Sequence, residues 1–185
     1  MKKRIVYSVL VSLAFVLTSC GTPEKKKTAE TKTAEANESS QIRIDTPYLP
    51  KPGSIKVAGE NVAIGDIDFS IKKVSKLDGV NGTKLAFIQY KVTNNTQQKN
   101  RPSEFWYRYV RVTQDSNIPL TVGALPFEEK ENKNGKLVKK ANRFLEKEQT
   151  TDGAVLYVLE NDSDVKITYL DTDYQEISSQ NYSLD

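Results

Sequence analysis

The single cysteine of the chain, Cys20, divides the sequence and limits how the folded part can be held together. It follows Leu17-Thr18-Ser19 in the pattern of a bacterial lipobox, where small residues precede the cleavage point and the next thiol carries diacylglycerol. We therefore expect Cys20 to be the lipid attachment residue. Because the chain has no second cysteine, no disulfide can bridge the two sheets of a sandwich, and packing alone must stabilise the core.

Residues 1–19 have the parts of a lipoprotein signal peptide. The cations from Lys2 to Arg4 precede an apolar run, Ile5 to Leu17, that is too short to span a bilayer stably. The alternative is an uncleaved N-terminal anchor that keeps a free cysteine. Both interpretations place the remaining chain on the extracellular face of the cell membrane. Each buried methylene contributes about 0.8 kcal/mol, so the two acyl chains of a diacylglycerol would hold the protein there through lipid.

The composition between Cys20 and the folded part predicts a tether. Residues 22–40 are dominated by Thr, Ala, Glu, Lys and Ser and contain no aromatic residue, so burial cannot offset the entropy of ordering the chain. We expect three parts. They are a signal peptide over 1–19, a lipidated cysteine with a disordered tether over 20–53, and one folded domain over 54–185.

The charge balance argues against nucleic acid as a partner. The full chain has 27 Lys and Arg against 24 Asp and Glu, but three of the cations belong to the signal peptide. The mature chain therefore carries equal numbers of both signs. Because such a surface has no basic field, we expect no nucleic-acid binding.

The domain has the pattern of a series of short strands. Ile67, Phe69 and Ile71 alternate with polar residues, and the dense apolar run over 85–92 is typical of a central strand. Further strands are expected over 105–112, 153–159, 165–170 and 175–178. Six short strands between Asn- and Asp-rich turns predict an all-β sandwich. Over 137–148 the apolar residues have helical spacing, and the sequence is compatible with either a short helix or a strand there.

Three stretches of the domain carry a resemblance to a known family. They are 85–96, which ends in Thr-Asn-Asn-Thr, 110–115, which ends in Gln-Asp, and 153–159, which opens on a glycine. These stretches resemble the telokin-like, immunoglobulin-fold domains of unknown function on bacterial surface lipoproteins. The resemblance covers residues 62–185 and implies an immunoglobulin-like β-sandwich with no established activity. The chain lacks the paired cysteines of antibody-type domains.

The sequence favours a noncatalytic protein. It contains no histidine, which removes every triad and metal site that depends on imidazole. Ser70 and Lys73 have the Ser-x-x-Lys spacing of penicillin-recognising enzymes. In a regular strand, however, side chains three positions apart point to opposite faces and cannot share a proton. We therefore expect no enzyme activity, no catalytic residue and no cofactor.

Pairs of aspartates two positions apart are the remaining candidates for metal or acid chemistry. They are Asp66 with Asp68, Asp162 with Asp164, and Asp171 with Asp173. None has EF-hand spacing, and aspartates gather in turns because they hydrogen-bond the local backbone. We expect no metal site. A carboxylate-dependent envelope hydrolase is kept as the alternative function.

The stretch from Phe105 to Tyr109 provides the candidate binding surface. If Val110 and Val112 face the core, alternation along a strand turns four side chains outward. These are Phe105, Tyr107, Tyr109 and Arg111. Exposed aromatic and arginine side chains are typical of binding hot spots, whereas a doubly covered strand or a bulge near Pro102 would bury them. We expect these four residues to bind an extracellular protein, peptide or envelope component.

Overall fold

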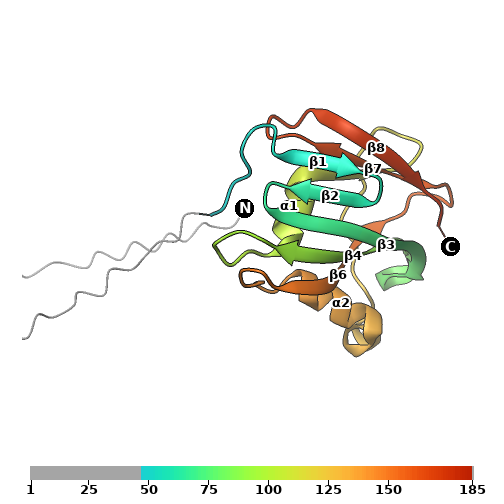
Figure 1. The fold of residues 1–185 in the computed structure, drawn as a ribbon. Helices are drawn as coiled ribbons and strands as arrows, with labels where there is room; N and C mark the ends of the chain where they lie inside the picture. Colours follow the sequence, from blue (N-terminus) through green and yellow to red (C-terminus); the bar gives the residue numbers. More distant parts are fainter. Residues whose placement is uncertain (1–46, 185) are drawn as a thin grey trace, which may run out of the picture. The chain divides into compact units, whose positions relative to one another are not determined.

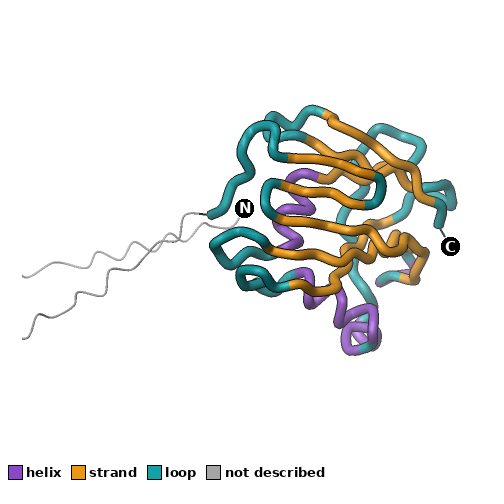
Figure 2. Tube along the Cα trace, in the orientation of Figure 1, coloured by secondary structure: helices purple, strands orange, loops and turns teal. Residues whose placement is uncertain are grey.

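The computed structural model describes residues 47–184, which form two antiparallel β-sheets and two short α-helices (Figures 1 and 2). The larger sheet contains β1 (Ile55–Ala58), β2 (Asn61–Ile64), β3 (Ile67–Asp78), β4 (Lys84–Asn94) and β6 (Thr150–Val158), in the order β1-β2-β3-β4-β6. The smaller sheet contains β5 (Val110–Thr113), β7 (Val165–Leu170) and β8 (Glu176–Tyr182), in the order β5-β7-β8. The helices are α1 (Pro102–Tyr109) and α2 (Lys133–Ala141), and two 3-10 turns are η1 (Val80–Gly82) and η2 (Phe127–Glu131). The predicted all-β sandwich is confirmed, while the signal peptide and Cys20 lie outside the described residues.

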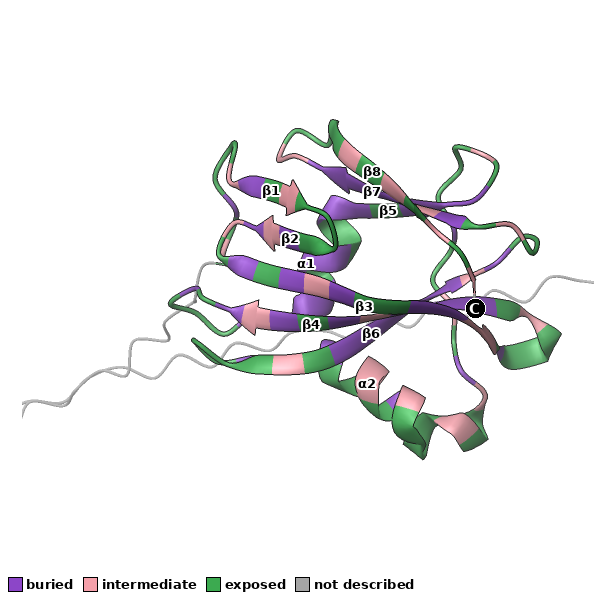
Figure 3. Cartoon of the chain, turned by 45° about the vertical axis from the view of Figure 1, so that its right-hand side comes forward, coloured by how far each residue is buried: buried purple, intermediate pink, exposed green. Residues whose placement is uncertain are grey.

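Strand β4 is central and is covered on both faces, as the dense run over 85–92 predicted. Its even-numbered residues Ala86, Ile88 and Tyr90 point into the main core, which residues of both sheets fill. Leu85 and Phe87 point the other way, into a second cluster that packs against partly buried side chains of α2. The helix lies beside β6 and covers this outer face (Figure 3).

Four aromatic side chains form the middle of the main core, and we call them the aromatic centre: Phe69, Tyr90, Trp106 and Tyr157. The Trp106 ring stacks on Tyr90 with centroids 5.1 Å apart and an interplanar angle of 15°. Phe69 meets both rings edge-on, at 5.2 and 5.7 Å. The indole Nε1 of Trp106 donates a hydrogen bond to the Tyr157 hydroxyl at 3.1 Å. The aromatic centre thus joins α1 to three strands of the larger sheet by ring packing and one hydrogen bond.

The strand predicted over 105–112 is wrong in its first half, because residues 102–109 form α1 and β5 begins only at Val110. Pro102 occupies the first helical position, where its fixed φ suits the helix and its missing N–H is not needed. A helix places Phe105, Trp106 and Tyr109 on one side, and all three are buried. Local β propensity is high here, but a helix buries Phe105 and Tyr109 together with Trp106, whereas a strand would turn residues 105 and 109 outward.

Three further features of the structure differ from the sequence prediction or complete it. Strands β1 and β2 were not predicted, although apolar residues alternate in both around the turn at Gly59, whose φ is +58°. Within 137–148 the chain is helical to Ala141 and then pairs Leu145 with Asn100. The Tyr48 ring lies 5.9 Å from that of Phe105, so contacts with the domain begin before Ser54, the predicted start of the folded part.

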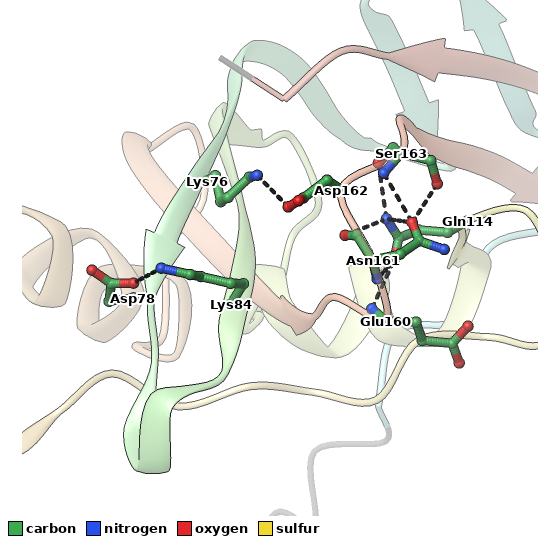
Figure 4. A network of polar contacts seen from close by, with 8 residues as sticks. All are labelled: Lys76, Asp78, Lys84, Gln114, Glu160, Asn161, Asp162 and Ser163. Atoms are coloured by element: carbon green, nitrogen blue, oxygen red, sulfur yellow. Dashed lines mark hydrogen bonds and ion pairs between the residues drawn. The ribbon is translucent and has the colours of Figure 1, made fainter.

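Two of the stretches that carry the family resemblance hold loops to the sandwich. The buried Asn94 amide donates to the backbone oxygens of Gln98 and Leu145, at 2.7 and 2.8 Å, and so ties the loop after β4 to the chain after α2. The buried Gln114 amide does the same for the turn between β6 and β7 (Figure 4). It accepts from the Glu160 N–H at 2.7 Å and donates to the Ser163 oxygen at 2.8 Å.

The glycine of the third stretch permits a close approach between elements. Gly153 lies opposite Tyr90 in the β4–β6 register. A Cβ at this position would lie 2.9 Å from Tyr90 Cε2 and 3.2 Å from the Ala141 Cβ of α2. All three stretches therefore serve the fold.

Replacing Gln114 by Ala should loosen the β6–β7 turn. The substitution leaves the Glu160 N–H and the Ser163 carbonyl without this partner, so we expect the free energy of unfolding to fall by about 1–3 kcal/mol. Denaturant titration followed by Trp106 fluorescence measures the change. The matched control is Gln97→Ala, because Gln97 is exposed and should change stability by less than about 0.5 kcal/mol. Equal effects of the two substitutions would contradict the anchoring role of Gln114.

Two Tyr→Phe substitutions in the aromatic centre should differ in their effect on stability. Burial raises the pKa of both Tyr90 and Tyr157, so both hydroxyls stay protonated at neutral pH. The Tyr90 hydroxyl has no hydrogen-bond partner among the described residues, so Tyr90→Phe should leave stability unchanged or raise it. Tyr157→Phe removes the acceptor of the Trp106 N–H and should cost about 1 kcal/mol. Denaturant titration of both variants measures this, and a larger loss for Tyr90→Phe would contradict the assignment.

Candidate partner-binding groove

Of the four residues predicted to bind a partner, two are exposed and two are buried. Tyr107 is 41% exposed and Arg111 is also exposed. Phe105 and Tyr109 are only 5% and 4% exposed, so the predicted outward aromatic ladder is wrong. The reason is the helix: residues 105 and 109 lie one turn apart on its inner face, while residue 107 lies on its outer side.

Tyr107 and Arg111 line the same hollow, which has a volume of about 370 Å³. Arg108 and Tyr174 line it too, and we call it the tyrosine–arginine groove after these four residues. Apolar side chains such as Val110, Leu120 and Leu170, all buried, form part of its lining. The groove therefore combines an apolar surface with exposed rings and two guanidinium groups.

The groove is built from four segments of the chain: 107–112, 119–122, Tyr157 of β6, and 170–174. The last turn of α1 supplies Tyr107 and Arg108, β5 supplies Arg111, and the β7–β8 turn supplies Tyr174. The segment 119–122 runs beside β5 and β6. Its Leu120 N–H donates to the Val112 oxygen of β5 at 2.8 Å, and its Val122 pairs with Tyr157 of β6.

Tyr174 is held in an unusual backbone conformation. Its φ is +61°, in the left-handed region that glycine or asparagine normally occupies. The Asp171 carboxylate closes this turn by accepting from the backbone N–H groups of Asp173 and Gln175, each at 2.8 Å. The Tyr174 ring is 55% exposed and stacks on the buried Tyr109 ring at 6.4 Å. Tyr109 therefore supports the groove from beneath.

The two arginines of the groove carry charges that are not balanced within it. Within residues 47–184, neither Arg108 nor Arg111 forms an ion pair or a side-chain hydrogen bond, and no carboxylate lines the groove. Some cations elsewhere in the domain do have ion-pair partners, as in the 2.6 Å contact between Lys76 and Asp162 (Figure 4). The groove therefore presents two positive charges that no described acid neutralises.

The polar residues considered for chemistry make local contacts. Ser70 Oγ accepts from Lys72 Nζ at 3.2 Å. A bulge between Ile71 and Lys73 leaves both Lys72 and Lys73 exposed, so strict alternation does not hold there and the opposite-face argument is wrong for this strand. The described residues show no hydrogen bond between Lys73 and Ser70.

Four of the six paired aspartates have side-chain contacts within the domain. Asp66 accepts from the Tyr48 hydroxyl at 3.2 Å, and Asp68 accepts from Asn95 at 2.7 Å. Asp162 pairs with Lys76, and Asp171 closes its own turn. In the part of the chain that the structure describes, no three acidic residues lie where they could hold a metal ion.

Sequence reasoning missed Arg108 and Tyr174. A helical interpretation of 102–109, supported by Pro102 at the first helical position and Glu104 in the first turn, would have placed Arg108 beside Tyr107. Tyr174 could have been recognised as a candidate binding residue because it is an aromatic residue at a turn position that glycine normally occupies.

Comparisons with known proteins agree with this fold. Residues 42–171 match a family model described as a domain of unknown function, DUF5067. No curated protein matches the chain.

Two solved structures share the fold. A candidate lipoprotein from Staphylococcus aureus is 20% identical with a TM-score of 0.60, over 70% of this chain and 91% of that one. A protein from Enterococcus faecalis is 16% identical with a TM-score of 0.57, over 72% of this chain and 95% of that one.

Proposed function

The chain belongs to DUF5067, a family of domains of unknown function, and we propose that it is a lipid-anchored envelope protein that binds a partner without catalysis. The partner is a protein or peptide, and the tyrosine–arginine groove receives it. The observation that supports this most directly is the meeting of exposed tyrosines and unpaired arginines over an apolar surface. Hot spots of protein interfaces are enriched in these residue types.

Anchoring through Cys20 is supported by the lipobox at Leu17-Thr18-Ser19 and by the candidate lipoprotein among the similar structures. Among residues 47–184, neither helix is long or apolar enough to cross a bilayer. Lipid on Cys20 would keep the folded domain at the extracellular face of the cell membrane. A diacylglycerol is sufficient for this, because two acyl chains hold a protein lastingly where one does not.

An immunoglobulin-like topology is supported by the strand order. In such domains strands A, B, E and D form one sheet, and C, F and G form the other. Here β3, β4 and β6 lie side by side as A, B and E do, and β5, β7 and β8 lie in the order C, F, G. The bridge between Val122 and Tyr157 lies beside β6, where strand D would be. The strands β1 and β2 extend the larger sheet beyond this pattern.

The absence of catalysis is supported by how the described acids and Ser70 are used. Four of the six paired aspartates close a turn, bind a side-chain amide or hydroxyl, or pair with lysine, as described above. None of these contacts places an acid, a base and a nucleophile around one reacting position.

Replacing Cys20 by Ala should release the protein from the membrane. Without the thiol no diacylglycerol is attached, so the variant should move from the membrane fraction to the medium or remain as an unlipidated precursor. Fractionation of cells, with mass spectrometry of the N-terminus, measures both. Ser40→Ala in the predicted tether is the control and should stay in the membrane fraction. Membrane retention of Cys20→Ala at the control level would contradict the anchor.

A photo-crosslinking residue at position 107 should capture the partner on intact cells. The same residue at position 91 is the control, because Lys91 is exposed on the outer face of the larger sheet. We expect one reproducible product from position 107, identified by mass spectrometry and absent from position 91. Adding Arg111→Ala should lower its yield about tenfold, as loss of a hot-spot side chain does. The same products from both positions, or none from position 107, would contradict the proposed function.

A further inference from the structure

We propose that the tyrosine–arginine groove binds an extended peptide segment that combines acidic and apolar side chains. This inference rests on the proposed function and names the chemistry of the partner at that same site. It depends on four observations: the charge of the groove, its apolar lining, the occupied strand edges beside it, and the backbone of Tyr174.

The charge of the groove selects an anionic partner. Arg108 and Arg111 have no ion pair among the described residues, and the lining includes no described carboxylate. A guanidinium group presents a planar set of donors that matches a carboxylate, so two of them favour a ligand with more than one acid. Charge complementarity therefore indicates an acidic segment.

The apolar lining distinguishes a peptide from other anionic partners near a membrane. An envelope polymer of phosphate groups has little apolar surface to place against Val122, which is 59% exposed and lines the groove. A flat bilayer surface would leave much of a hollow of about 370 Å³ unfilled. An extended peptide can alternate acidic side chains toward the arginines with apolar side chains toward the floor.

The strand edges beside the groove are already occupied. The Val112 oxygen of β5 accepts from Leu120, and β6 exchanges hydrogen bonds with Thr121 and Gly123 at 2.8 and 3.0 Å. A peptide cannot add to either edge at these positions without displacing the segment 119–123. The peptide is therefore held mainly by side-chain contacts, and its acidic and apolar composition decides the affinity.

The backbone of Tyr174 indicates a role beyond the turn. A non-glycine residue in the left-handed region costs about 1 kcal/mol or more, and such outliers cluster at functional sites. Glycine would fit the turn without this cost. The exposed ring of Tyr174 lies over Tyr109 and beside the arginines, where it adds contact area for a bound peptide.

A selection from a display library of random twelve-residue peptides tests the inference. The target is the full lipidated chain in neutral phosphatidylcholine vesicles. We expect the enriched peptides to carry an excess of Asp and Glu together with Leu, Val or aromatic residues. Their affinity should fall at least tenfold in the Arg108→Glu, Arg111→Glu double variant, and it should weaken as salt is raised.

Two further variants separate binding from folding. Lys56→Glu with Lys91→Glu makes the same charge change on the outer face of the larger sheet, and it should leave peptide affinity within twofold. Tyr174→Gly relieves the left-handed strain, so it should keep the thermal midpoint while lowering peptide affinity about fivefold or more. A Tyr174→Gly variant that binds as well as the unchanged chain would overturn the role of this ring.

The remaining outcomes also decide the matter. Enrichment of peptides without acidic excess, equal binding by the two charge-reversed variants, or no enriched peptide overturns the inference. The inference is also overturned if no peptide is enriched and the chain binds phosphatidylglycerol vesicles only when both arginines are present. In that case the groove binds the membrane surface. In each of these cases a protein crosslinked from position 107 would still support the proposed function, so the two failures are distinguishable.

Discussion

The stacking of Trp106 on Tyr90 is the interaction on which the rest of the structure depends. The chain has one cysteine, and it lies outside the domain, so no disulfide can join the two sheets. The aromatic centre takes that place at the middle of the sandwich, where an antibody domain packs a tryptophan against its disulfide. Because Trp106 belongs to α1 and not to a strand, the same contact that fills the core also fixes a helix against the larger sheet.

That placement of α1 creates the groove. With Phe105, Trp106 and Tyr109 turned inward, the opposite side of the helix presents Tyr107 and Arg108 to solvent. The chain then enters β5 directly, which brings Arg111 alongside, and Tyr109 supports the ring of Tyr174. The core and the proposed binding surface are thus two sides of one eight-residue helix.

The stretches that resemble a known family serve the architecture. Asn94 and Gln114 are buried amides that replace missing backbone partners in two loops, and Gly153 leaves room for Tyr90 and Ala141. Buried amides and close-approach glycines are demanding positions, because an unpaired polar group or an added Cβ is costly there. A resemblance based on them therefore indicates a shared sandwich and says nothing about the ligand, and the groove uses other residues.

The sequence by itself determined the all-β class, the central position of β4 and the span of β7, because alternation and dense apolar runs are local patterns. It also singled out Tyr107 and Arg111, two of the residues that line the groove. Only the tertiary structure decided that 102–109 is a helix, since the helix buries Phe105 and Tyr109 together with Trp106, whereas a strand would leave residues 105 and 109 outward. The groove itself joins 107–112, 119–122, 157 and 170–174, and no local pattern couples side chains so far apart in the chain.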